Sequence, residues 1–214
     1  DIHAPQRPFV QARRSLAEWR LHDPNRVDLL DVVANAHPTV LIAVAGQAGA
    51  LTEPIVREMA AHTDRPIIFP LSNPTSRIEA MPADILQWSN GRALIATGIP
   101  VDPVELEGVR HTIGQANNAL LYPGLGLGTI VSGARRVTPG MLLAAAEAVV
   151  AQVDVSEPGA ALLPPISDLR ASSATVAVAV VKAAQADGVA TVTSDDTVQA
   201  VLDAMWQPTY EGVV

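Results

Sequence analysis

Short apolar runs alternate with segments of helical periodicity through the first half of the chain. Each run is bounded by proline, glycine or polar residues, which predicts fully buried β-strands. The runs cover residues 39–44, 66–70 and 93–97. Apolar residues at helical spacing predict helices over residues 26–36, 53–62 and, as one or two short turns, within 78–90. Strands separated by helices form right-handed crossovers, so this half of the chain predicts the parallel sheet of an α/β protein.

The second half of the chain is predicted to be mainly helical. A glycine-rich stretch leads into a helix over residues 125–136, and Thr138 caps the next one over 139–153. Two further helices are expected from Ser167 or Asp168 to 186, and from Ser194 or Asp195 to about 206. No change in composition marks a domain boundary. We therefore expect residues 1–214 to form a single domain portion, with helices 138–206 packing on or beside the sheet.

Composition limits the classes of function. Hydrophobic residues make up 49% of the 214 residues, enough for a sizeable core. The net charge of −8 argues against binding to nucleic acid or to an anionic membrane surface. No apolar run reaches about 18 residues, so no membrane span is expected. The absence of cysteine fits a cytoplasmic protein. The chain begins with Asp1 rather than methionine, from which we expect a processed or truncated chain.

Small and amide-bearing residues follow the predicted strands. Gly46 and Gly49 come after the first strand, and Asn73 comes after the second. The adjacent amides Asn117 and Asn118 lie beyond the third, just ahead of a glycine-rich stretch. The carboxyl ends of parallel strands share one edge of a sheet, where open α/β proteins bind their ligands. Amide side chains can both donate and accept hydrogen bonds, so this edge is the candidate binding site.

Turn chemistry is the competing interpretation of the same residues. Asn-Asn and Pro-Gly pairs are common in turns that bind nothing. The spacing Gly46-x-x-Gly49 also differs from the Gly-x-Gly-x-x-Gly fingerprint of dinucleotide sites, and a plain turn between strand and helix has the same form.

A complete active site is not visible among the other residues. Lys182, the only lysine, lies in the middle of a predicted helix, where a solvated side chain is the expected role. His62 and His111 are assigned structural roles, because the histidines lack metal-ligand spacing. Asp168 is first of all a helix cap. From the residues alone, the chain is part of a nucleotide-binding α/β domain.

The order of six motifs adds a resemblance to a known family. The chain resembles the malic enzymes and the closely related malolactic enzyme from about Gln6 to Trp206. The motifs are Gly46-Gln-Ala-Gly-Ala-Leu-Thr-Glu53, Pro70-Leu-Ser-Asn-Pro-Thr75, Gly98-Ile-Pro-Val-Asp-Pro103, Gly114-Gln-Ala-Asn-Asn-Ala119, Tyr122-Pro-Gly-Leu-Gly-Leu-Gly128 and Leu163-Pro-Pro-Ile-Ser-Asp168. The resemblance implies a Rossmann-like parallel sheet, represented by its carboxyl-terminal part, with additional C-terminal helices.

The resemblance also implies a cofactor and a set of site residues. Gly46 matches a turn near the dinucleotide NAD, and Asn73 matches an asparagine on the cofactor and substrate side. Asn117 matches the amide that meets malate and the nicotinamide, and Asn118 lies beside it on the substrate side. The family's catalytic Tyr and Lys, and the carboxylates that hold Mg²⁺ or Mn²⁺, have no matching positions here. No catalytic residue and no metal ligand is therefore assigned to this chain.

Three functions follow as hypotheses. The first is the NAD-binding part of an enzyme that converts malate to pyruvate and CO₂, inactive without an amino-terminal catalytic portion on the same or another chain. The second is malolactic conversion of malate to lactate and CO₂. The third is a fragment that binds a nucleotide or a partner without catalysis. A homo-oligomer is expected from the family, while the choice between NAD and NADP stays open.

Overall fold

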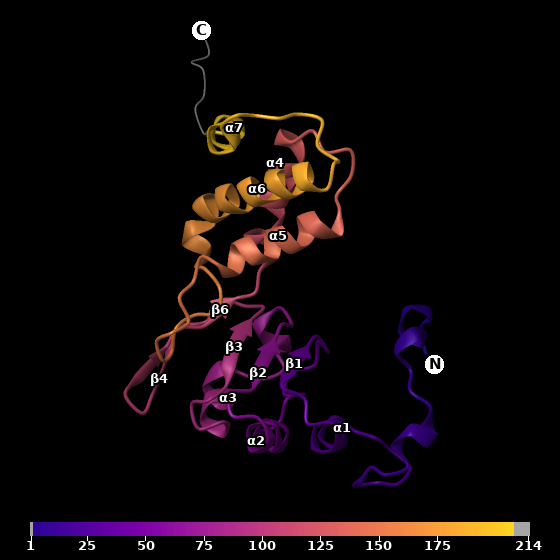
Figure 1. Cartoon of the computed structure of the whole chain (residues 1–214). Coiled ribbons are helices and arrows are strands. Elements are labelled where there is room, and N and C mark those ends of the chain that lie inside the picture. Colours follow the sequence, from indigo (N-terminus) through magenta and orange to yellow (C-terminus); the bar gives the residue numbers. More distant parts are fainter. Residues whose placement is uncertain (1, 208–214) are drawn as a thin grey trace.

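The computed structural model describes residues 2–207 and contains two groups of elements (Figure 1). A four-stranded parallel sheet with three helices forms the first group, and four helices form the second. The strands are β1 (Val40–Ala43), β2 (Ile67–Pro70), β3 (Leu94–Thr97) and β6 (Gly114–Gln115), in that order across the sheet. The predicted α/β fold with a Rossmann-like parallel sheet is confirmed.

Three helices cover one face of the sheet. They are α1 (Leu29–Ala36), α2 (Glu53–His62) and α3 (Pro82–Trp88). Register places Leu41, Ile68 and Ile95 side by side on neighbouring strands, and all three pack in one apolar cluster with these helices. The bounds of α2 match the sequence prediction, with Pro54 in the first turn and Thr52 at the N-cap position, although the Thr52 side chain makes no capping hydrogen bond.

The opposite face of the sheet is exposed along β1 and half-buried to buried along β2 and β3. Val40 and Ile42 of β1 point to that side and are 45% and 57% exposed. The prediction that the first strand is fully buried is therefore wrong. An apolar run shows that a strand can be buried on both faces, but it does not show whether this chain supplies both covers.

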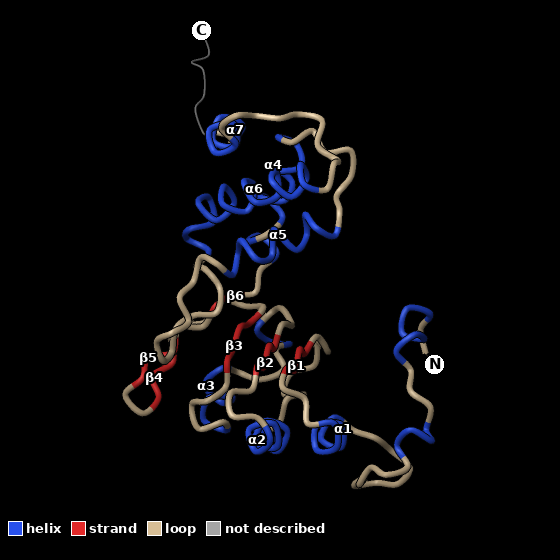
Figure 2. The backbone as a smooth tube through the Cα atoms, viewed as in Figure 1, coloured by secondary structure: helices blue, strands red, loops and turns tan. Residues whose placement is uncertain are grey.

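A two-stranded hairpin beside the sheet was not predicted. It consists of β4 (Val104–Leu106) and β5 (Val109–His111), paired antiparallel (Figure 2). Glu107 and Gly108 form the turn and both have positive φ angles, of 50° and 79°. This geometry matches the right-handed twist of the two strands.

The second group contains the helices α4 (Tyr122–Val131), α5 (Pro139–Val150), α6 (Leu169–Ala186) and α7 (Thr197–Ala204). Thr138 caps α5 as predicted, with its hydroxyl accepting from the Met141 amide. The expectation that the glycine-rich stretch precedes the helix is wrong, because these glycines lie inside α4. Gly124 and Gly128 contact α6, where a Cβ atom would come within 2.7 Å of Val176 or Val180.

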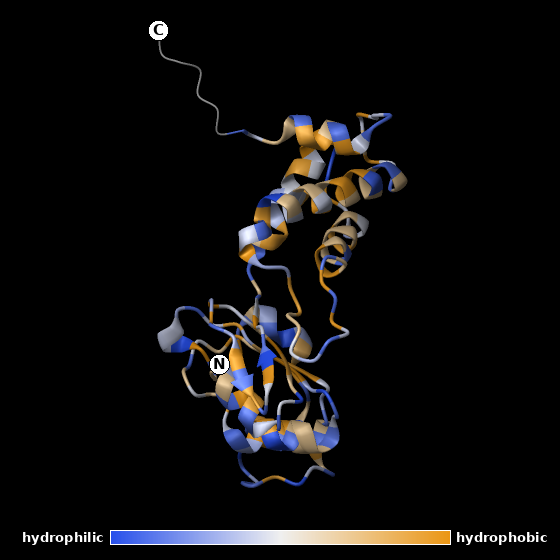
Figure 3. Ribbon diagram, turned by 90° about the vertical axis from the view of Figure 1, so that its left-hand side faces the viewer, coloured by the Kyte–Doolittle hydropathy of each residue, from blue (hydrophilic) through white to orange (hydrophobic). Residues whose placement is uncertain are grey.

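The helical group lies beyond the carboxyl ends of the strands. The arrowhead of β3 points toward it in Figure 1, and the view turned by 90° in Figure 3 shows the same separation. Helices α4 to α7 form apolar clusters with one another, distinct from the cluster under the sheet. That residues 1–214 act as a single domain portion, with helices 138–206 on or beside the sheet, stays a prediction.

Short 3₁₀ turns complete the described chain. They are η1 (Ala4–Phe9), η2 (Arg13–Leu16), η3 (Thr75–Arg77), η4 (Asn118–Leu120) and η5 (Ile166–Asp168). Within residues 2–207, no helix combines the length and the hydropathy needed to cross a lipid bilayer.

Candidate functional site

A row of turns at the carboxyl edge of the sheet forms the candidate site. Ala45 and Gly46 follow β1, Ser72 and Asn73 follow β2, and Gly98 follows β3. Residues 116–118 follow β6 at the end of the row. Adjacent strands lie about 4.8 Å apart, so the four turns form a continuous edge.

A buried carboxylate joins the turns after β1 and β2. The side chain of Glu79 is fully buried and accepts hydrogen bonds from the amides of Ala45 at 2.7 Å and Gly46 at 3.2 Å. It also accepts from the amide of Ser72 at 3.3 Å and from the Ser72 hydroxyl. The Ser72 hydroxyl thus donates to Glu79, and its oxygen accepts a hydrogen bond from the Gly46 amide at 2.9 Å. Two loops far apart in sequence are thus bonded to one carboxyl group.

These hydrogen bonds keep Glu79 ionised. Burial acts to raise the pKa of the Glu79 carboxyl, because the charged form loses water. The bonds from the Ser72 hydroxyl and from the amides of Ser72 and Gly46 act in the opposite direction and outweigh burial. The pKa of Glu79 therefore lies below its usual value, and a buried negative charge is held at the strand ends.

Close backbone approach joins the remaining turns. A Cβ atom on Gly98 would overlap the carbonyl oxygen of Leu71, so only glycine fits where the ends of β2 and β3 meet. The Gly98 carbonyl accepts a bond of 3.2 Å from the side-chain amide of Gln115. The Ala116 amide donates to the Thr97 carbonyl at 2.7 Å. All four strand ends are therefore linked directly.

The predicted site residues lie along this row, and they differ in which of their hydrogen-bonding groups are already bonded within the protein. The amide of Gly46, whose φ is +63°, already donates to Ser72 and Glu79, so this residue offers its Cα surface to a ligand rather than its N–H. Asn73 is exposed beside Ser72. The side-chain oxygen of Asn117 accepts a hydrogen bond from the Ala119 amide at 2.9 Å. The side-chain NH₂ group of Asn117 has no hydrogen-bond partner within residues 2–207. Asn118 is exposed.

The turn interpretation therefore holds for the side-chain oxygen of Asn117, whereas ligand binding by its NH₂ group stays a prediction. Its oxygen makes the turn that begins η4, as turn chemistry predicts. Its two N–H groups stay available to a hydroxyl, carbonyl or carboxylate of a ligand.

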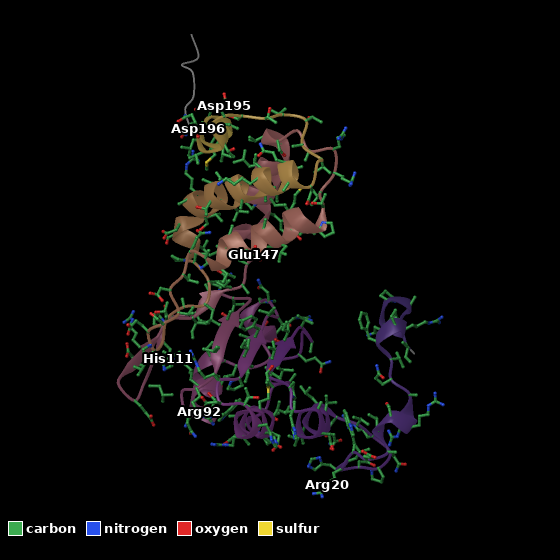
Figure 4. The ribbon with its side chains drawn as sticks, viewed as in Figure 1. Arg20, Arg92, His111, Glu147, Asp195 and Asp196 are labelled. Atoms are coloured by element: carbon green, nitrogen blue, oxygen red, sulfur yellow. The ribbon has the colours of Figure 1, made fainter. Side chains whose placement is uncertain are left out.

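Two pockets lie at opposite ends of the sheet. A pocket of about 530 Å³ lies on the candidate-site side, lined by Gly49, Thr52, Thr75 and Glu79 among others. A pocket of about 520 Å³ lies near the amino ends of the strands, lined by Arg92 and by residues of the β4–β5 hairpin. Figure 4 shows Arg92 and His111 on that far side of the sheet, away from the helical group. The first of these two pockets adjoins the row of turns, as does a pocket of about 470 Å³ lined by Thr75, Ile99 and Pro100 among others.

The Arg77 guanidinium lies close to the site, 3.9 Å from where a Cβ atom on Gly46 would be, whereas the residues assigned structural roles from the sequence lie on other elements. Lys182 is exposed on α6. His62 bonds Glu58 at 2.9 Å and stacks on His37, which is a structural role. His111 lines the far pocket. Asp168 lies at the N-cap position of α6 without a side-chain cap bond.

One group of ligand-type side chains lies among residues 2–207, and most of its carboxylate oxygens already accept hydrogen bonds within the protein. It consists of His22, Asp28 and Asp31 near the start of α1. Asp28 and Asp31 bond each other's backbone amides as a capping box, and the Asp31 carboxylate also bonds His22. These contacts account for both carboxylates, and the group lies beside α1 rather than on the row of turns.

Sequence reasoning missed Glu79. It lies in the predicted helical stretch 78–90 as a single acid between Ile78 and Ala80. The one available signal was an acid flanked by apolar residues, which predicts an acid that must be paired.

The family model described as "Malic enzyme, NAD binding domain" matches residues 1–185 of the chain. NAD-dependent malic enzyme 3 of Bacillus subtilis is 50% identical over 209 residues, covering 97% of this chain and 37% of that relative. The NAD-dependent malic enzyme of Edwardsiella ictaluri is 51% identical over 207 residues, covering 96% of this chain and 36% of that relative. The chain therefore spans little more than a third of the length of these relatives.

Solved structures give the same answer for the fold. The crystal structure of the malic enzyme of Entamoeba histolytica matches with a TM-score of 0.66 and 25% identity, over 85% of this chain and 34% of that one. The malic enzyme of Pyrococcus horikoshii matches with a TM-score of 0.64 and 23% identity, over 82% of this chain and 36% of that one.

Proposed function

The chain belongs to the malic enzyme family, and from this premise we propose that it is the NAD-binding part of an enzyme that oxidises and decarboxylates malate. The overall reaction converts malate and NAD to pyruvate, CO₂ and reduced NAD. The curated relatives named above are called NAD-dependent malic enzymes, which does not favour the malolactic or the non-catalytic alternative.

The row of linked turns is the observation that carries this proposal. Ser72 and Glu79 hold the first two turns together, and Gly98 keeps side-chain atoms away from the middle of the row. The donors at its rim include the amide groups of Asn73, Asn117 and Asn118. This set fits the ribose and carboxamide groups of a nicotinamide nucleotide, which need hydrogen-bond donors and acceptors but no counter-charge. The glycine fingerprint for the pyrophosphate has no counterpart in this chain.

The residues are proposed to act by binding and orientation. Gly46 and Asn73 bind the cofactor, with Asn73 also reaching malate, and Asn117 directs its N–H groups to malate beside the nicotinamide. Asn118 adds a second amide on the substrate side. When bound, NAD accepts the hydride that leaves the carbinol carbon of malate. Positioning of the two reactants by these amides lowers the barrier without any acid or base from this chain.

The rest of the site is proposed to come from an amino-terminal catalytic portion. The exposed face of β1 supports this, because parallel sheets are covered on both faces and β1 leaves Val40 and Ile42 exposed. That portion would supply the acid, the base and the carboxylates for Mg²⁺ or Mn²⁺, and this chain alone is expected to be inactive. We further propose a cytoplasmic homo-oligomer that binds neither nucleic acid nor membrane.

Malate oxidation by the complete enzyme tests the proposal. The assay follows the absorbance of reduced nicotinamide with malate, NAD and Mg²⁺, and then identifies the product acid. Absorbance growth with pyruvate as product is the expected result. Lactate formation without net reduction of NAD, or no turnover at all, would overturn it. Residues 1–214 alone are the matched control and should give no absorbance change.

A further inference from the structure

A buried carboxylate that accepts four hydrogen bonds lies beneath the turns of the candidate site. Glu79 has no exposed surface, yet four donors from two different turns converge on its carboxylate. These donors are the amides of Ala45, Gly46 and Ser72 and the Ser72 hydroxyl. A buried carboxylate without such partners would be strongly destabilising, so the two turns and the acid require one another.

The bonds fix the shape of the turn that faces the ligand. Gly46 has a left-handed backbone, and its amide is held from behind by Glu79 and the Ser72 hydroxyl. The Leu51 amide donates to the main-chain carbonyl of Glu79 at 3.1 Å, which holds the start of α2 to the same residue. The turn after β1 is thus attached at both of its ends to the segment that follows β2.

From this geometry we propose that Glu79 is a positioning residue for the cofactor, which holds the turns after β1 and β2 in the arrangement that receives the nicotinamide nucleotide. Glu79 does not touch the ligand itself. The inference rests on the proposed function and adds to it a residue outside the set of site residues. Ser72 is the second member of this arrangement, since its hydroxyl lies between the Gly46 amide and the carboxylate.

A glutamine at position 79 is the sharpest perturbation. Glu79→Gln keeps the size of the side chain but replaces one carboxylate oxygen by an NH₂ group, which cannot accept from the backbone N–H groups that face it. Ser72→Ala is milder, because the carboxylate keeps its bond from Ala45. Binding of NADH to the complete enzyme, followed by nicotinamide fluorescence without malate, measures the effect on the cofactor alone.

Glu79→Gln is expected to raise the Kd for NADH about tenfold or more, and Ser72→Ala by a smaller factor of about three, as expected for the loss of hydrogen bonds to a charged group. The KM for NAD should rise in parallel while kcat at saturating NAD changes little, because the catalytic groups are untouched. Amide hydrogen exchange at Ala45 and Gly46 should accelerate in Glu79→Gln.

Asp31→Asn is the matched control. Asp31 is also a buried acid that accepts from backbone amides, those of His22 and Asp28, but it lies beside α1, away from the candidate site. This variant should lower the melting temperature and leave the Kd for NADH unchanged. A purely structural role for Glu79 would make the two variants alike in both measurements.

The possible failures are distinguishable. If the unmodified complete enzyme binds no NADH, the proposed function fails and this inference fails with it. If the unmodified enzyme binds NADH and Glu79→Gln binds it equally well, only this inference is overturned. Should Glu79→Gln not fold, Ser72→Ala decides, and an unchanged Kd for NADH in that variant overturns the inference.

Discussion

Replacement of Gly128 by alanine is expected to force α4 and α6 apart. A Cβ atom at this position would lie 2.7 Å from the Ala177 carbonyl oxygen and 2.7 Å from the Val180 Cβ, whereas ordinary contact begins at 3.4 Å. The helices would have to separate by about 0.7 Å, because the first of these atoms is backbone and the second is the root of a buried side chain. Overpacking of this kind costs about 1–3 kcal/mol of the free energy of unfolding.

Gly126 provides a control within the same helix. It is exposed, and a Cβ atom there would meet nothing within 4 Å. Alanine is better than glycine in a helix by about 1 kcal/mol, and both variants gain this amount. The difference in stability between Gly128→Ala and Gly126→Ala therefore isolates the clash with α6.

Thermal unfolding of the two variants, followed by circular dichroism, measures this difference. Gly126→Ala should raise the melting temperature of the chain by about 2–4 °C, since each kcal/mol shifts a protein of this size by that amount. Gly128→Ala should melt below Gly126→Ala by about 2–4 °C for each kcal/mol of the clash. If Gly128→Ala melts at or above the temperature of Gly126→Ala, the close contact of α4 with α6 is refuted.

Three further predictions concern the site and its surroundings. Asn117→Ala in the complete enzyme should lower kcat/KM for malate by the equivalent of about 1–3 kcal/mol, since the N–H groups of Asn117 would no longer bind the substrate. An unchanged kcat/KM would show that Asn117 does not bind malate. Asn118→Ala should have the smaller effect, because Asn118 is the more exposed. Gly98→Ala should reduce the yield of folded chain, because the added methyl overlaps a backbone carbonyl, and a normal melting temperature would contradict this. The hydrogen bond to Asp31 raises the pKa of His22, so protonated His22 stabilises the folded chain below pH 6.5. This stabilisation is lost as the pH rises through the raised pKa, and the melting temperature of the unmodified chain should fall over that range. A melting temperature that stays constant with pH, as expected for His22→Gln, would refute the pairing.

Local signals were enough to predict most elements of the chain. Thr52 and Pro54 begin α2, and Thr138 caps α5, because the groups that begin a helix lie within one turn of it. The apolar runs predicted the existence of β1, β2 and β3, because the signal for each strand lies within its own residues. The hairpin of β4 and β5 was missed because its strands are three residues each and none of their residues is fully buried.

Features that depend on a distant partner could not be predicted from local sequence. The glycines of α4 have the composition of a turn, yet Val176 and Val180 of α6 leave room only for glycine at positions 124 and 128. The same limit applies to the candidate site. The amide residues were visible as strand-end residues, but the role of Glu79 depends on two turns that meet it only after the sheet has formed.

The exposed face of β1 and the buried carboxylate of Glu79 both bear on the position of β1 and of the turn that follows it. Glu79 holds the turn after β1, while Val40 and Ile42 on the same strand have no cover among residues 2–207. Whatever covers this face also restrains β1, and with it the position of the Gly46 turn. Cofactor binding and attachment of the covering portion should therefore favour each other, because each acts on the same strand. We accordingly expect residues 1–214 alone to bind NADH more weakly than the complete enzyme does, both because the glycine fingerprint for the pyrophosphate is missing and because β1 lacks its cover.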